Sequence, residues 1–118
     1  MENLISVLFL ARDVAHREHL RTTSFAHHMA LDFFYNEIIQ NADAITEAYQ
    51  GQFDLLPPIP IKAYTGTKDI IPTLQEYLQW IKDNRYKVVA KEETAIQNLI
   101  DEAVSTFQST LYKLRFLK

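Results

Sequence analysis

The stretch that decides the fold is FAHHMALDFFYNEIIQNADAITEAY, residues 25–49. It contains no proline or glycine, and its apolar residues recur at spacings of three and four, which is typical of an α-helix. Residues 22–24 are hydroxyl side chains that can cap its free amides, and Gly51 is expected to end it in a left-handed conformation. Apolar residues occur nearly all round this helix, which indicates a contact surface in addition to the core.

The flanking sequence predicts three further helices and one irregular connection. Upstream, an apolar stripe from Leu4 to about Leu20 indicates a helix that is joined to residues 25–49 by a tight turn. Residues 52–67 contain three prolines and Gly66, which favours an extended crossover. Periodic stretches at 69–83 and 91–117 predict the last two helices. We therefore expect an all-α four-helix bundle with a proline-rich crossover between its second and third helices.

Composition and charge limit the classes of function. The chain has 118 residues, 47% of them hydrophobic, with two glycines and four prolines, so we expect one helix-rich domain over residues 1–118. A net charge of −3 leaves no basic surplus for binding nucleic acid, and the absence of cysteine excludes disulfides and thiolate metal sites. The apolar run 5–11 is too short for a membrane span, and a cytoplasmic location is expected.

Four candidate metal ligands follow one another along residues 25–49. His28 and Asp32 are one helical turn apart, and so are Asp43 and Glu47. The step from Asp32 to Asp43 is close to three full turns, so both pairs project from one stripe of the helix. At about 1.5 Å of rise per residue that step is roughly 16 Å, too far for one metal centre to bind both pairs of the same helix.

Two arrangements of the ligand pairs are consistent with this separation. In the first, the pairs form two separate weak sites. In the second, another copy lies antiparallel across a twofold axis near Glu37 and Ile38. His28 and Asp32 of one chain then face Asp43 and Glu47 of the other. A turn centred near residue 22 would place His16 beside His28 as a further ligand. Two imidazoles and three carboxylates suit ferrous iron better than structural zinc or calcium, although other divalent metals remain candidates.

The spacing of these five residues resembles the ferroxidase-centre signature of the Dps-type miniferritins. The pattern is His16, eleven residues, His28, three residues, Asp32, ten residues, Asp43, three residues, Glu47. The resemblance implies a ferritin-like four-helix bundle, in a divergent and shortened form. It also implies that this chain oxidises ferrous iron with peroxide or oxygen at a homodimer interface, at a di-iron centre or at one iron with a weaker second site.

Two other functions compete with this interpretation. The first is a helical-bundle interaction protein that binds metal structurally or not at all, without oxidase turnover. The second is a metal-dependent hydrolase, whose site would consist of His16, His19 and His28. No catalytic residue is expected beyond the metal ligands, and the sequence leaves open whether assembly stops at two copies or continues to a cage.

Overall fold

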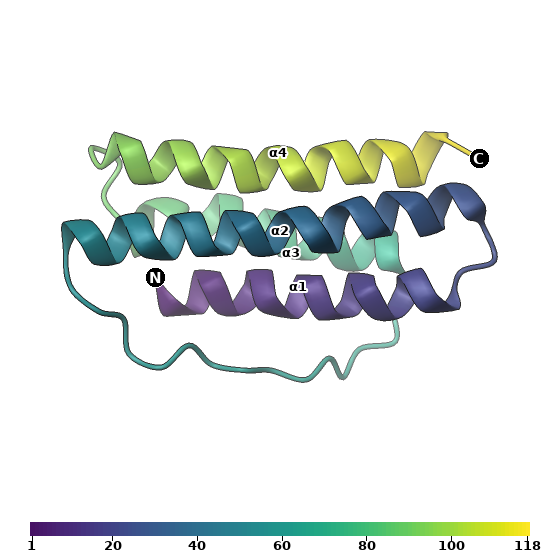
Figure 1. Cartoon of the computed structure of the whole chain (residues 1–118), viewed down its shortest axis with the longest axis horizontal. Coiled ribbons are helices and arrows are strands. Elements are labelled where there is room, and N and C mark those ends of the chain that lie inside the picture. The colour runs from purple at the N-terminus through teal and green to yellow at the C-terminus, as the bar shows by residue number, and fades with distance from the viewer.

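Four helices make up the fold in the computed structural model, which describes residues 1–118 (Figure 1). They are α1 (Glu2–Arg21), α2 (Phe25–Gln52), α3 (Ile70–Val88) and α4 (Thr94–Phe116), and there are no strands. The prediction of an all-α chain with four helices is confirmed. None of these helices combines the length and the apolar character needed to cross a membrane.

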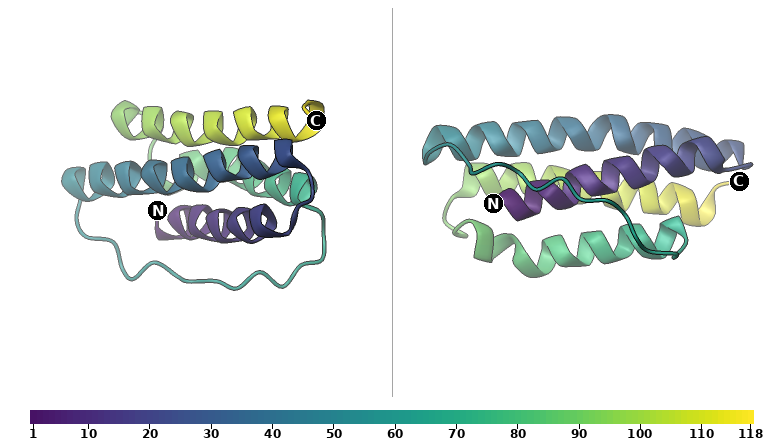
Figure 2. Two further views of the ribbon diagram at one scale, coloured as in Figure 1. Left: turned by 45° about the vertical axis from the view of Figure 1, so that its right-hand side comes forward. Right: turned by 90° about the horizontal axis from the view of Figure 1, so that it is seen from below.

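The helices form two antiparallel pairs joined by a long crossover. Helix α2 runs back along α1, the crossover returns along the length of the molecule, and α3 and α4 then form the second pair (Figures 1 and 2). Helix α1 packs against α2 and α3, and α4 packs against α2 and α3, whereas the diagonal pairs make no helix contacts. Helix α2 therefore has two helical neighbours and keeps an outer face that no other helix covers.

The core forms where the inward stripes of all four helices meet. Phe34 of α2 and Phe107 of α4 are fully buried and pack edge to face, with ring centroids 5.0 Å apart. Leu8, Leu74 and Ile100 are also buried in this single apolar cluster. Burial of such side chains is the main term that holds a small helical bundle together.

Helix ends differ from the expected ones at three places. Helix α2 continues through Gly51, whose φ is not positive, so the expected left-handed cap is wrong. The Phe53 amide still donates to the Tyr49 carbonyl at 2.9 Å, and one helical glycine costs only about 1 kcal/mol. Helix α3 passes Asn84, whose side-chain amide donates to the Trp80 carbonyl. Helix α4 begins only at Thr94.

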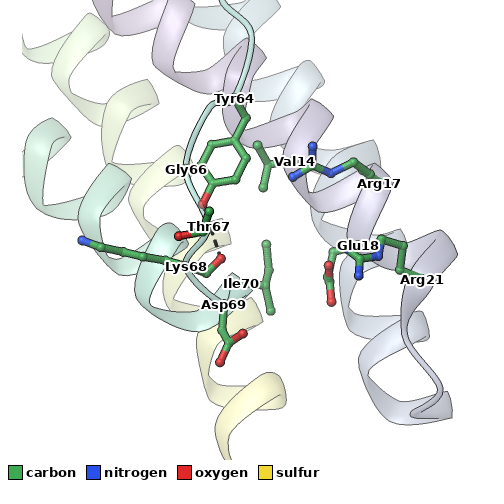
Figure 3. A pocket seen from close by; sticks show the side chains of 10 residues that line it. All are labelled: Val14, Arg17, Glu18, Arg21, Tyr64, Gly66, Thr67, Lys68, Asp69 and Ile70. Carbon is green, nitrogen blue, oxygen red and sulfur yellow. Dashed lines mark hydrogen bonds between the residues drawn. The ribbon is translucent and has the colours of Figure 1, made fainter.

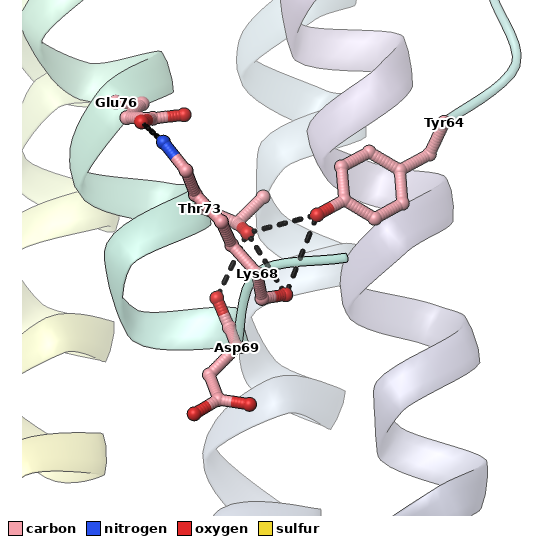
Figure 4. A network of polar contacts seen from close by, with 5 residues as sticks. All are labelled: Tyr64, Lys68, Asp69, Thr73 and Glu76. Carbon is pink, nitrogen blue, oxygen red and sulfur yellow. Dashed lines mark hydrogen bonds and ion pairs between the residues drawn. The ribbon is translucent and has the colours of Figure 1, made fainter. Parts of the chain in front are cut away.

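The crossover packs across α1 and is hydrogen-bonded to it. The Ser6 hydroxyl donates to the Pro60 carbonyl at 2.7 Å, and Figure 2 shows the crossover passing over α1. At the far end the Thr73 hydroxyl donates to the Asp69 carbonyl at 2.8 Å and lies 3.2 Å from the Tyr64 hydroxyl (Figure 4). These contacts fix the end of the crossover to the first turn of α3, and the Arg17 guanidinium of α1 lies 5.2 Å from the centre of the Tyr64 ring.

Candidate metal centre on the outer face of α2

The turn between α1 and α2 is built from the hydroxyl residues that the sequence places there. Ser24 is the N-cap of α2, and its hydroxyl accepts a hydrogen bond from the His27 amide at 3.2 Å. Such a cap satisfies one of the free amides of the first helical turn. Because this connection is short, it brings the last turn of α1 and the first turn of α2 side by side. His19, His27 and His28 lie in these two turns, and His16 lies just before them in α1.

His19 and His28 form a reciprocal pair across this turn. Their rings stack with centroids 3.7 Å apart, the His19 Nδ1–H donates to the His28 carbonyl at 2.8 Å, and the His28 Nδ1–H donates to the His19 carbonyl at 2.9 Å. A carbonyl can only accept, so each Nδ1 carries the proton. In the neutral form each Nε2 is then a lone pair, which is the form of imidazole that binds a metal.

The structure corrects the expected pairing of His16 with His28. His19 is the direct neighbour of His28, because the turn is centred one residue later than expected and the helix phase points His16 elsewhere. His16 is exposed, and its ring stacks on Tyr35 at 4.2 Å, 6.1 Å from the His19 ring. His16 and His28 therefore lie on the same side of the hairpin but are separated by intervening rings.

Asp32 is held in place by Tyr35. The Tyr35 hydroxyl donates to Asp32 Oδ1 at 2.9 Å, across one turn of α2. This hydrogen bond, with burial and the charge of the carboxylate, raises the pKa of Tyr35 above its ordinary value. Tyr35 thus contacts both His16 and Asp32, and it orients two of the five predicted ligands.

Asp43 and Glu47 lie on the outer face of α2, far along the helix from the histidines. Both are exposed, and neither takes part in any of the four ion pairs of the chain. Helix α2 is continuous from Phe25 to Gln52, so the separation of roughly 16 Å between the two ligand pairs applies as predicted from the helical rise.

Within one chain these side chains do not complete a metal site. No group of three or more histidine or acidic side chains is placed so that it could hold one metal ion. That holds for His16, His28 and Asp32, and it holds for the His16, His19 and His28 set of a hydrolase. A site that uses the predicted ligands needs donors from a second chain.

A polar cavity lies elsewhere, between α1 and the end of the crossover (Figure 3). It has a volume of about 230 Å³ and contains none of the five predicted ligands. Arg17 and Arg21 line it together with Glu18 and Asp69, so its wall has charges of both signs. Its Lys68 is already paired with Glu76 (Figure 4).

Two residues of the α1–α2 hairpin were not among the five predicted iron ligands, although His19 was part of the alternative hydrolase site. His19 supplies the carbonyl that orients His28, and Tyr35 supplies the hydroxyl that orients Asp32. A signal for Tyr35 was available, since it follows Asp32 by three residues and His28 by seven, which places all three on one helix side. The role of His19 depends on the length of the turn and had no such signal.

Comparison with known proteins places the chain in a family. The sequence model of a family of unknown function (DUF5856) matches residues 19–114, which is most of the chain. The chain belongs to this family. The match includes His28, Asp32, Asp43 and Glu47, while His16 lies three residues before it.

One curated relative of this DUF5856 protein comes from a bacteriophage. It is an "uncharacterized 14.6 kDa protein in mobD-ri intergenic region" of Enterobacteria phage T4, 27% identical over 115 residues. The similarity covers 96% of this chain and 86% of the phage protein. No solved structure matches the chain.

Proposed function

We propose that this chain binds ferrous iron and oxidises it at a site that a second copy completes. The observation that carries the proposal is the hydrogen bond from His28 Nδ1–H to the His19 carbonyl. It leaves His28 Nε2 as a lone pair with no hydrogen-bond partner in the chain, one helical turn from Asp32, whose carboxylate Tyr35 anchors. Metal-binding histidines are commonly oriented in this way, with the second ring nitrogen donating to a carbonyl or carboxylate.

The donor set fits a redox-active divalent metal. His16 and His28 supply imidazole nitrogen, and Asp32, Asp43 and Glu47 supply carboxylate oxygen, a mixture that suits first-row metals such as iron. The three carboxylates stabilise the increase in positive charge when ferrous iron becomes ferric. If two ferrous ions each lost one electron, one hydrogen peroxide would accept both electrons and two protons and leave as two molecules of water.

A single twofold axis satisfies both ligand pairs. The midpoint of residues 28 and 47 and the midpoint of residues 32 and 43 both fall between Glu37 and Ile38. An antiparallel second α2 would therefore bring Glu47 to His28 and Asp43 to Asp32 in the same register. The outer face of α2 is available for this contact, because Asn36, Gln40, Asp43 and Glu47 are exposed there and no helix of the chain covers them.

The order of the helices is compatible with a ferritin-like bundle, which supports the proposal. Two antiparallel pairs are linked by one long crossover, so α2 and α3 run in the same direction (Figure 1). Ferritin-like folds have one connection of this kind, and they bind metals with side chains from facing helices. Here the proposed ligands lie on the outer face of α2, so a second copy has to supply the facing helix.

The test is an anaerobic titration with ferrous iron followed by addition of peroxide, with ferric absorbance as the measurement. We expect wild-type protein to bind and oxidise iron, and a His28→Ala, Asp43→Ala double variant to lose most of both activities. An Asp83→Ala variant, with an exposed acid of α3 removed, is the matched control and should behave as wild type. Oxidation by the wild type that does not exceed the double variant would refute the proposal.

Sharing of the site is tested by mixing two inactive variants. His28→Ala and Glu47→Ala chains each damage both sites of their own homodimer, but a heterodimer of the two contains one undamaged site. Each heterodimer should therefore recover up to about half of the wild-type iron binding, and a randomly paired mixture, in which half of the dimers are heterodimers, about a quarter. Confirmed heterodimers that bind no iron would count against a shared site.

An interaction protein without oxidase turnover is the second candidate function. It is favoured by apolar side chains that α2 leaves exposed near its start, since Phe25 is 78% exposed and Met29 is 51% exposed. Contiguous exposed apolar groups commonly mark contact sites for other proteins. Self-association of wild-type protein that binds no iron would favour this candidate.

A further inference from the structure

Large apolar side chains are exposed where α1 ends, α2 begins and α4 ends. These three helix ends lie at the same end of the bundle (Figure 1). Leu20 of α1 is 72% exposed, Phe25 of α2 is 78% exposed and Phe116 of α4 is 62% exposed. The exposed apolar surface therefore extends over three helices, and it is wider than the side of any one of them.

Between α2 and α4 this surface forms an apolar groove with a basic rim. The Lys113 ammonium lies 3.9 Å from the centre of the Phe33 ring, so a positive charge is held beside the apolar side chains. The groove has a volume of about 420 Å³. The residues that line it include Phe25, Met29, Leu117, Lys113 and Lys118.

Unpaired positive charge surrounds the apolar surface, although the chain as a whole has a net charge of −3. Two acids, Glu18 of α1 and Asp69 before α3, also lie at this end of the bundle. The cations outnumber them and take part in none of the ion pairs of the chain. They are Arg21 at the end of α1 and Lys113, Arg115 and Lys118 at the end of α4 or just after it.

The sign of the charge reverses along the face that α2 and α4 form. Further from this end, Glu37 of α2 and Glu102 of α4 line a second groove, together with polar side chains such as Asn41 and Ser105. A partner helix laid along the whole face would meet an apolar, basic half and then a polar, acidic half. A flat anionic surface that touches only the end of the bundle meets the basic half and avoids the acidic one.

We propose that this end of the bundle docks on an anionic lipid surface. Exposed aromatic and aliphatic side chains enter the boundary between headgroups and acyl chains, and the lysines and arginines around them contact the anionic headgroups. Each cation close to such a surface adds attraction, which salt weakens. Both the apolar side chains and the unpaired cations of this end are used in the contact.

Vesicle cosedimentation of the metal-free protein tests this contact. The two probes are vesicles of phosphatidylcholine alone and vesicles of equal parts phosphatidylglycerol and phosphatidylcholine. We expect wild-type protein to bind the anionic vesicles at least about tenfold more strongly than the neutral ones, and less strongly as salt is raised. Binding to neither vesicle would overturn the inference and leave the apolar surface to a protein partner. Equal binding to both vesicles would also overturn it.

Charge variants locate the contact on the bundle. Lys113→Glu with Lys118→Glu should weaken binding to the anionic vesicles at least about tenfold, because it replaces two attractive charges by two repulsive ones. Lys82→Glu with Lys87→Glu makes the same change in net charge in the second half of α3, towards the opposite end of the bundle. This control should weaken binding no more than about twofold, since its charges lie beyond the screening distance. Equal losses in the two variants would contradict docking by the proposed end.

An apolar variant tests insertion without any change of charge. Phe25→Ser should weaken binding to the anionic vesicles about tenfold, because it removes an aromatic group from the lipid boundary. Leu55→Ser is the matched control, since Leu55 is also 78% exposed but lies beyond the far end of α2. Wild-type binding by the Phe25 variant would show that this side chain does not enter the lipid. Circular dichroism checks that each variant remains helical.

Docking on lipid does not depend on the proposed iron site. In the antiparallel pair of the proposed function the two docking ends would lie at opposite ends of the dimer, so each surface would meet one copy of a pair. Metal-free protein that binds anionic vesicles therefore supports the docking contact even if the iron titration fails. Protein that oxidises iron and binds no vesicles overturns the docking contact and leaves the iron site standing.

Discussion

The inward and outward faces of α2 have the same backbone and opposite environments. On the inward face Leu31, Phe34, Ile38 and Ile45 are fully buried in the core. On the outward face apolar residues, acids and amides are exposed, and no other helix covers them. The inward face forms the core, and we propose that the exposed side chains of the outward face serve iron binding and self-association.

The adjacent residues Phe34 and Phe33 provide the largest expected contrast between the two faces. Phe34→Ala should lower the free energy of unfolding by about 3–5 kcal/mol, because it leaves a cavity against Phe107. Phe33→Ala should cost about 1 kcal/mol, since Phe33 is 38% exposed and Lys113 lies over its ring. Urea denaturation measures both values. Equal losses at the two positions would show that the outward face also supports the fold of the single chain.

A smaller contrast is expected between two histidines of the candidate site. His28→Ala should lower the free energy of unfolding by about 1–2 kcal/mol, because it removes a reciprocal hydrogen bond and the stacked partner of His19. His16→Ala should change it by no more than about 0.5 kcal/mol, since His16 is exposed. Thermal denaturation of metal-free protein provides the measurement. A larger loss for His16→Ala than for His28→Ala would contradict the described geometry.

The smallest effect is a shift in the titration of Tyr35. Its pKa is raised because a phenolate would lose the hydrogen bond to Asp32 and lie next to a second negative charge. Asp32→Asn should therefore lower the pKa of Tyr35 towards its ordinary value, which phenolate absorbance follows, with Tyr35→Phe to identify the signal. Tyr77 is an internal reference, because burial raises its pKa to about 12 and Asp32→Asn should not change it. An unchanged titration of Tyr35 would show that Asp32 is not held as described.

Local patterns in the sequence were sufficient for the helices and the turn. Apolar residues three and four apart predicted all four helices, and Ser24 caps α2 as its hydroxyl suggested. The prolines of the crossover also predicted its irregular path. The helix ends were less predictable, because Gly51 and Asn84 are tolerated inside helices when neighbouring turns continue the hydrogen-bond ladder.

The candidate site was predictable only in part. Helical spacing correctly placed Asp43 and Glu47 together on one face, and Asp32 on the same side of the helix. It could not predict which histidine of α1 would meet His28, because that depends on the turn and on the relative rotation of two packed helices. It did predict that the two ligand pairs do not converge within a single chain, because the rise of the helix separates them by roughly 16 Å.

The sequence by itself determined the distance between the two ligand pairs, since the rise of an uninterrupted helix is fixed by its backbone hydrogen bonds. It therefore also determined that these residues need a second chain if they are to bind one metal centre together. Only the tertiary structure decided that His19 orients His28, that Tyr35 lies between His16 and Asp32, and that a basic apolar groove forms beside the start of α2. Those features depend on how separate helices pack, and packing is set by contacts between residues far apart in the chain.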